Sequence, residues 1–280
     1  MSRRQFLKAA LVAAAGSVCA YPWLAEHRLL RVNRYRLPIP HLPEAFRGFT
    51  IAQVTDMHLG PMVSERFLGK VIKKANGLGA DAIVLTGDHV HGRGTRASVE
   101  RAWDLLSPLE APDGVHAVLG NHDYGQKDCS TQLLSESGWS LHGKVLPLRR
   151  DGQTLWLVGA GDFWRDNLPL DPLLEKLPEK DCRIVLAHNP DTADSTRHGR
   201  TDLFISGHTH GGQVHIPFIG TPVLPVRNKT YSSGLRRSPR GESVFICRGI
   251  GWSILPVRFL CPPELAVLEL VPAEDREASA

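Results

Sequence analysis

Residues 51–58 read Ile-Ala-Gln-Val-Thr-Asp-Met-His, a short apolar run that ends in a carboxylate and an imidazole. Four later apolar runs, at 82–86, 115–119, 184–187 and 203–206, are followed by similar polar groups. Such runs predict buried strands. The clusters that follow the five runs are Asp56-Met57-His58, Gly87-Asp88, Gly120-Asn121-His122-Asp123, His188-Asn189 and Gly207-His208-Thr209-His210. Because open α/β folds bind ligands at strand ends, we expect all five clusters on one rim of a sheet.

The side chains in these clusters suit two adjacent divalent metals. Such a pair lies about 3.5–4 Å apart in phosphoesterases and needs a shared ligand, for which Asp88, alone at its strand end, is the natural candidate. Asp56 and His58 stand two residues apart on an extended chain, so both side chains can bind one metal, and the same holds for His208 and His210. Mixed nitrogen and oxygen sites favour Mn, Fe or Zn over Mg, and the sequence does not choose among the three.

From Asp56 to His210, the order of the clusters and the residues within each resemble those of the calcineurin-like metallophosphoesterase family. The resemblance implies an α/β fold built as a four-layer α/β/β/α sandwich. It implies that one metal is held by Asp56, His58, Asp88 and His210, and the other by Asp88, Asn121, His188 and His208. It further implies a nucleophilic hydroxide bridging the metals. His122 lies over the substrate phosphate in this family, where it either protonates the leaving-group oxygen or stabilises the transition-state charge, with Asp123 orienting the imidazole by a hydrogen bond.

Within the family, the sequence resembles the exported bacterial branch often called YkuE/YaeI-like. The residues that carry this likeness are Leu42-Pro43, His188-Asn189-Pro190-Asp191, Gly207–Gln213 and Arg248-Gly249. The resemblance implies a phosphodiesterase of the cell envelope, acting on a small-molecule or lipid-linked phosphodiester or pyrophosphate. The alternatives are a UDP-2,3-diacylglucosamine pyrophosphatase-like hydrolase of lipid A synthesis, a phosphomonoesterase or a protein phosphatase. A non-catalytic binding scaffold is the alternative of another class, and the complete ligand set argues against it.

The N-terminus is an export segment. Residues 2–8 read Ser-Arg-Arg-Gln-Phe-Leu-Lys, which resembles a twin-arginine signal, and an uncharged, Ala-rich stretch follows at 9–20. This pattern predicts export by the twin-arginine machinery and an extracytoplasmic location, in the periplasm or cell envelope. The sequence leaves open whether the segment is cleaved after Ala20 or kept as an inner-membrane anchor.

The expected division of the chain is an export segment at 1–25, a lead-in segment with an edge strand at 26–48, a catalytic domain at 49–272 and a tail at 273–280. The net charge of +4 is modest, and no nucleic-acid module is recognisable. A basic cluster follows the export segment and fits either a solvated edge strand or contact with anionic lipid headgroups: Arg28, Arg31, Arg34 and Arg36. The four later cysteines lack metal-site spacing, and disulfide pairs cannot be assigned.

The patterns predict helices at 64–78, with a Ser64 cap, and at 96–106 and 131–136. They predict a hairpin around Asp151-Gly152 and late strands at 213–216, 244–247 and 265–270. His89 and His91 lie on a Gly-rich loop that either faces substrate or is solvated, and we favour a solvated loop. Asp162 is interpreted as structural or substrate-facing.

Overall fold

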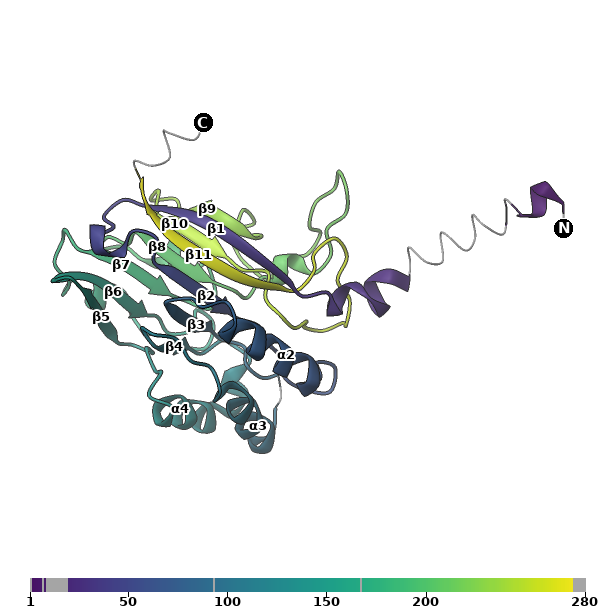
Figure 1. The fold of residues 1–280 in the computed structure, drawn as a ribbon, viewed down its shortest axis with the longest axis horizontal. Helices are drawn as coiled ribbons and strands as arrows, with labels where there is room; N and C mark the ends of the chain where they lie inside the picture. Colours follow the sequence, from purple (N-terminus) through teal and green to yellow (C-terminus); the bar gives the residue numbers. More distant parts are fainter. Residues whose placement is uncertain (1, 7, 9–19, 93, 167, 274–280) are drawn as a thin grey trace.

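The computed structural model describes residues 2–6, 8, 20–92, 94–166 and 168–273. Within these residues the strands form two mixed sheets (Figure 1). The first has the order β1-β11-β2-β3-β4, with bounds Arg31–Ile39, Glu264–Pro272, Thr50–Val54, Ala82–Thr86 and Val115–Val118. The second has the order β5-β6-β7-β8-β10-β9, with bounds Val145–Arg150, Gln153–Gly159, Cys182–Leu186, Leu203–Ser206, Ser243–Ile246 and Gly234–Arg237. Helices α2, α3, α4, α5 and α6 have the bounds Glu65–Asn76, Arg96–Leu106, Lys127–Glu136, Asp171–Leu174 and Thr192–Ser195.

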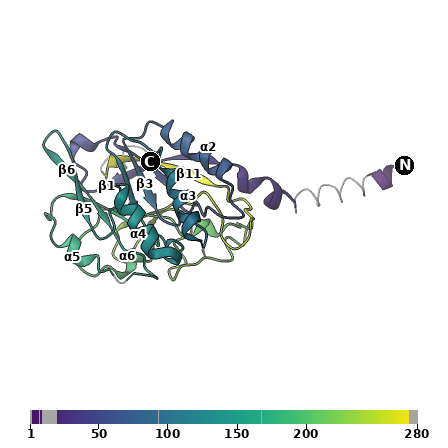
Figure 2. The ribbon, with the colours of Figure 1, turned by 90° about the horizontal axis from the view of Figure 1, so that it is seen from below.

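Strand β3 shows why the first sheet is covered on both faces. All five of its residues are buried, and its side chains alternate between two apolar clusters. Ile83 and Leu85 pack with residues of α2, α3 and α4, whereas Val84 packs with residues of the second sheet, such as Leu186. Figure 2 shows the three helices on the outside of the first sheet. The first sheet therefore forms an inner layer between helices and the second sheet.

The second sheet is likewise covered on its outer face. Val185 and Phe204 pack there with Leu174 of α5, Ala193 of α6 and the buried Tyr231. This gives four layers, with helices outside two central sheets, although α5 and α6 are only four residues long. The predicted α/β/β/α fold class is confirmed.

Several local predictions are confirmed because their signals are local. The Ser64 side chain accepts a hydrogen bond from Phe67 N at the start of α2, and α3 has the predicted bounds. Strands β2, β3 and β4 are parallel, and β5 and β6 pair antiparallel around Asp151-Gly152. Both turn residues have positive φ, 47° and 73°, as a two-residue hairpin turn requires.

The strand predicted at 213–216 is wrong. This segment makes only isolated bridges, from Val214 to Phe259 and from Ile216 to Gly220. Its backbone enters from Gly211, Gly212 and Gln213, all with positive φ, and such residues cannot continue an extended strand. Helix α4 also begins four residues earlier than predicted.

The lead-in segment contributes β1, which is an edge strand of the first sheet and pairs with β11 in parallel. Arg31, Arg34 and Arg36 are exposed on it, and Arg36 Nε lies 3.5 Å from Glu269 Oε1. No helix among the described residues is long and apolar enough to cross a membrane. Four cysteines are buried free thiols: Cys129, Cys182, Cys247 and Cys261.

Candidate metal centre

The structure brings the predicted metal ligands together at the carboxyl ends of five strands. Asp56 and His58 follow β2, Asp88 follows β3, Asn121 follows β4, His188 follows β7, and His208 and His210 follow β8. The rim belongs to two sheets, so the expectation of a single sheet is wrong. Gln53 joins the two halves, because its Nε2 donates to Thr86 Oγ1 at 2.8 Å and to Ser206 O at 2.9 Å.

The backbone of this rim is strained. Five of the candidate ligands have positive φ, between 48° and 68°: Asp56, His58, Asp88, His208 and His210. Such conformations cost a non-glycine residue about 1–3 kcal/mol and gather at functional sites. Glycines allow the close packing this requires, since a Cβ on Gly120 would lie 2.3 Å from Asp88 Oδ1 and one on Gly207 the same distance from Asp56 Oδ2.

Asp56, His58 and His210 form one ligand group, whose candidate donor atoms all lie within 4.8 Å of one another. His58 Nε2 lies 2.9 Å from His210 Nε2, which in turn lies 3.4 Å from Asp56 Oδ1. All three residues are buried. The two imidazole nitrogens face each other beside a carboxylate, and at this distance they are well placed to share a cation.

Asp88, His188 and His208 form a second group of the same compactness. His188 Nε2 lies 3.3 Å from Asp88 Oδ2, 3.1 Å from His208 Nδ1 and 3.2 Å from Asn121 Oδ1. Asp88 Oδ2 also lies 3.5 Å from His58 Nε2, in the first group. One carboxylate oxygen thus reaches both groups.

Hydrogen bonds to the far side of two rings fix which nitrogen faces the centre. His188 Nδ1 lies 2.8 Å from Thr86 O and therefore donates to it, so Nε2 is the nitrogen that faces the centre and that a metal would bind in place of a proton. His208 Nε2 lies 2.8 Å from Pro225 O, so Nδ1 faces the centre in the same way. Carbonyl partners of this kind orient metal-binding histidines and raise their basicity.

The electrostatics of the cluster also favour cations. Burial lowers the pKa of His58 to about 3 and that of His208 to about 3, so both imidazoles are neutral and able to donate a lone pair. Burial raises the pKa of Asp56 to about 6, and the neighbouring Asp88 carboxylate acts in the same direction. At His188 burial opposes protonation, but the Asp88 carboxylate outweighs it and raises the pKa to about 10. Convergent lone pairs and buried carboxylates fit bound divalent metals.

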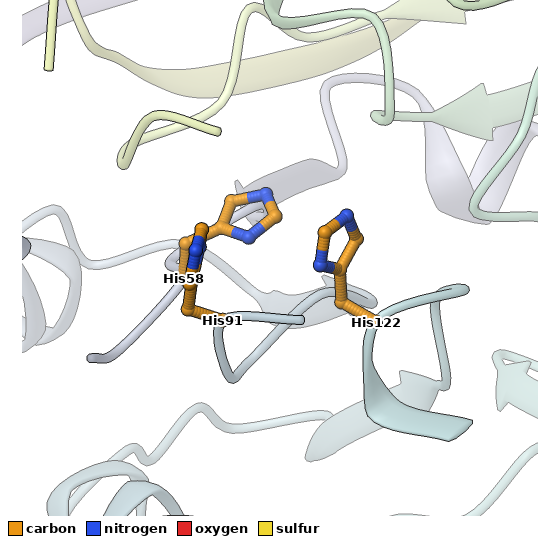
Figure 3. Close-up of side chains that lie close together, drawn as sticks. All are labelled: His58, His91 and His122. Atoms are coloured by element: carbon orange, nitrogen blue, oxygen red, sulfur yellow. The ribbon is translucent and has the colours of Figure 1, made fainter. Parts of the chain in front are cut away.

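His122 lies at the edge of the cluster, on the turn after β4, with its side chain 25% exposed. Its Nδ1 accepts a hydrogen bond of 2.7 Å from Gly92 N, so in the neutral ring Nε2 carries the proton. That Nε2 lies 4.0 Å from Asp88 Oδ2. Figure 3 shows His122 facing the rings of His58 and His91. The interpretation of His91 as part of a solvated loop is wrong, because its half-buried ring lies 5.9 Å from that of His122.

The sequence predicts that Asp123 orients the imidazole of His122, but in the structure it does not. Its buried carboxylate accepts hydrogen bonds from the backbone N–H groups of Asp88, His89, Val90 and Gly120. It also pairs with Nδ1 of His89, which is buried rather than solvated. Among the described residues no hydrogen bond links Asp123 to His122. Asp123 instead holds the loop that carries Asp88 in place.

We expect Asp123→Asn to destabilise the fold by about 2 kcal/mol or more, because an amide group must face several backbone donors with only one acceptor oxygen. It should also lower metal content through displacement of Asp88. Urea unfolding and metal analysis would measure both effects. Asp104→Asn, at an exposed position on α3, is the control and should change neither. Unchanged stability of Asp123→Asn would contradict this role.

Comparison with known proteins identifies the family. Residues 49–212 match the profile described as Calcineurin-like phosphoesterase. The chain belongs to this family. Residues 1–18 match the TAT (twin-arginine translocation) pathway signal sequence, which indicates export from the cytoplasm.

Three relatives of this calcineurin-like phosphoesterase are similar over nearly its whole length. "Uncharacterized metallophosphoesterase YkuE" of Bacillus subtilis is 32% identical, covering 96% of this chain and 98% of the relative. "Phosphodiesterase YaeI" of Escherichia coli is 33% identical, covering 97% and 100%. "UDP-2,3-diacylglucosamine pyrophosphatase LpxG" of Chlamydia trachomatis is 26% identical, covering 94% and 98%. Family membership and the His/Asp clusters together imply divalent metal ions.

In this phosphoesterase the centre forms the floor of a cavity of about 580 Å³. Asp88, Asn121, His122, His208 and His210 contribute to the floor. The walls are largely apolar and come from distant segments: Trp164, Val214, Val223, Ile254, Leu255 and Val257. The cavity therefore combines a polar floor with apolar walls, as ligand pockets commonly do.

Two residues that the sequence does not indicate also shape this cavity. Trp164 packs its ring edge-on against His208, with centroids 4.4 Å apart. It is held by Asp162, whose Oδ1 accepts from Trp164 N, so Asp162 is structural. Arg258 is a fully buried cation that donates to the carbonyl groups of Gly249, Gly251 and Cys261, and it ties down the loop carrying Ile254 and Leu255. No periodicity or motif in the sequence marks either side chain.

Proposed function

We propose that this calcineurin-like phosphoesterase is a dinuclear-metal phosphodiesterase of the cell envelope. The observation that carries the proposal is the position of Asp88 Oδ2, within 3.5 Å of both His58 Nε2 and His188 Nε2. One cation would be held by Asp56, His58, Asp88 and His210, and the other by Asp88, Asn121, His188 and His208. Their donor chemistry suits Mn, Fe or Zn.

The chain's own groups account for the remaining roles. Bound in this way, two divalent cations would lower the pKa of the attacking water and neutralise charge on the phosphoryl oxygens. His122 presents Nε2–H to the cavity, where it would hydrogen-bond the leaving-group oxygen, stabilise the negative charge that develops there and pass it the proton, which solvent then replaces on the ring. The Gly92 N–H bond to Nδ1 keeps this tautomer in place. The apolar walls exclude water and strengthen these electrostatic interactions.

The second candidate function is hydrolysis of a lipid-linked pyrophosphate, in the manner of a UDP-2,3-diacylglucosamine pyrophosphatase. The apolar cavity walls favour an amphiphilic substrate, and LpxG is similar over nearly the full chain. Twin-arginine export favours the envelope phosphodiesterase instead, because export removes the enzyme from a cytoplasmic substrate. An N-terminal segment that is kept after export would hold the enzyme at the inner membrane, whereas cleavage after Ala20 would release it.

A parallel assay of three substrates tests the proposal. Protein reconstituted with Mn, Fe or Zn would be given a chromogenic phosphodiester, the matching monoester and a lipid-linked pyrophosphate. We expect the diester to have a higher kcat/KM than the monoester. Preference for the pyrophosphate would establish the second candidate, and absence of hydrolysis with all three metals would contradict both.

A further inference from the structure

Two loops beside the cavity expose large apolar side chains to solvent. The first loop carries Phe218 and Ile219, whose exposed fractions are 108% and 73%. The second loop carries Ile254, which is 83% exposed, and the exposed Leu255 and Leu260. Hydrogen bonds of 2.8 Å link the loops, from Phe259 N to Gln213 O and from His215 N to Phe259 O. Joined apolar surface of this kind marks an interaction site.

The backbone presents these side chains at a conformational cost. Phe218, Ile254 and Leu260 have φ of 67°, 66° and 50°. Bulky and β-branched residues rarely adopt this region, and holding one there strains the backbone. Glycine or asparagine would be less strained at all three positions. A function that needs exposed apolar side chains explains why these three positions carry Phe, Ile and Leu.

The N-terminal segment lies against the same loops. Arg258 N donates to Pro22 O at 3.2 Å, and Cys261 N donates to Glu26 Oε1 at 2.7 Å. Trp23 and Leu24 are exposed there. Figure 1 shows this segment leaving the molecule beside the loops. In the sequence, residues 9–19 just before it carry no charge and are mostly apolar. The exposed loops therefore contact the described segment at residues 20–26, which follows this uncharged stretch in the sequence.

A basic cavity of about 350 Å³ opens next to the first loop. Lys229, Arg236 and Arg248 line it together with Thr221 and Leu260, and no carboxylate does. Within the described part of the chain, none of these three cations forms a salt bridge. Positive charge without a counter-ion, beside exposed apolar groups, is complementary to an anionic phospholipid.

We propose that this face docks on a bilayer containing anionic phospholipids. The loop tips at Phe218, Ile219 and Ile254 enter the headgroup region, and the basic cavity takes a lipid phosphate. Ile254 and Leu255 also wall the metal cavity, so docking brings that cavity to the lipid surface. The substrate is then an amphiphilic phosphoester drawn from the membrane. This last step rests on the proposed function, whereas docking itself does not.

Vesicle co-sedimentation of the full chain tests the docking. The double variant Phe218→Asn, Ile219→Thr removes apolar area while keeping a residue that tolerates positive φ and a β-branched one. We expect at least about tenfold weaker binding to vesicles of phosphatidylcholine with phosphatidylglycerol. Hydrolysis of a soluble chromogenic diester should stay at the wild-type level, because neither residue lines the metal cavity. The soluble assay thus reports on the proposed function separately from docking.

The cation variants test the headgroup site. Lys229→Gln and Arg248→Gln should each weaken binding to the anionic vesicles about fivefold. Binding to pure phosphatidylcholine should not change. The matched control, Arg34→Gln with Arg36→Gln on β1, removes two exposed cations away from the loops and should leave the vesicle preference intact.

Three results would overturn the proposal. One is undiminished vesicle binding by Phe218→Asn, Ile219→Thr, with thermal unfolding showing that the variant is folded. Another is loss of binding only in the β1 control, which would assign lipid contact to the edge strand. The third is sedimentation showing a lipid-independent dimer that this double variant dissociates, which would make the face a contact between copies. If inorganic phosphate alone releases the bound protein from the vesicles, the basic cavity is a site for free phosphate and not for a lipid headgroup.

Discussion

Asp88→Asn should abolish most activity and remove bound metal. The amide keeps the shape of the side chain but has one acceptor oxygen and no charge, so it cannot link two cations. Replacing a hydrogen-bonding partner of a metal ligand costs about 10–100-fold in affinity or activity, so loss of a shared ligand should exceed about 10²-fold. Metal analysis of purified protein and kcat/KM on a chromogenic diester would measure both losses.

Asp162→Asn is the matched control for this prediction. Asp162 is also a buried aspartate near a strand end, but it bonds to Trp164 N and Arg165 N and belongs to neither ligand group. Its variant should keep wild-type metal content. If Asp88→Asn retains two metals per chain and full turnover, the dinuclear assignment is wrong.

The ligand clusters could be located from the sequence because each is local. A buried strand and the polar residues at its end are adjacent in the chain, so Asp56 and His58 could be placed without knowing the fold. The bounds of α3 followed in the same way from the apolar spacing along it. Parallel pairing of β2, β3 and β4 then carried three clusters to one rim.

The remaining features of the site depend on contacts between distant segments. Asp123 bonds to the loop after β3 rather than to its neighbour His122, and nothing adjacent to it in sequence indicates this. His91 reaches the cluster because the loop after β3 folds back beside β2's end, where Leu59 and Val90 form a bridge. The apolar cavity walls come from segments far apart in the sequence, and no local pattern marks them as neighbours: Trp164, Val214, Val223, Ile254, Leu255 and Val257.

His122→Ala should lower turnover by about 10²–10⁴-fold while leaving metal content nearly unchanged. The ring belongs to a compact group with His58 and His91, but its Nδ1 is occupied by Gly92 N and its Nε2 is 4.0 Å from Asp88 Oδ2. It is therefore better placed to donate a proton into the cavity than to complete either ligand group. Metal analysis and kcat with diesters of different leaving groups would measure this.

The leaving-group series separates proton donation from other roles. A general acid matters most when the leaving oxygen is strongly basic, so the defect of His122→Ala should be large for an alkyl ester and small for a nitrophenyl ester. His91→Ala is the control, since its ring lies beside the same cluster but has no comparable path to the leaving oxygen. We expect its effect on turnover to be independent of the leaving group. A uniform defect in His122→Ala across the series would mean that His122 stabilises phosphoryl charge, and loss of metal would make it a ligand.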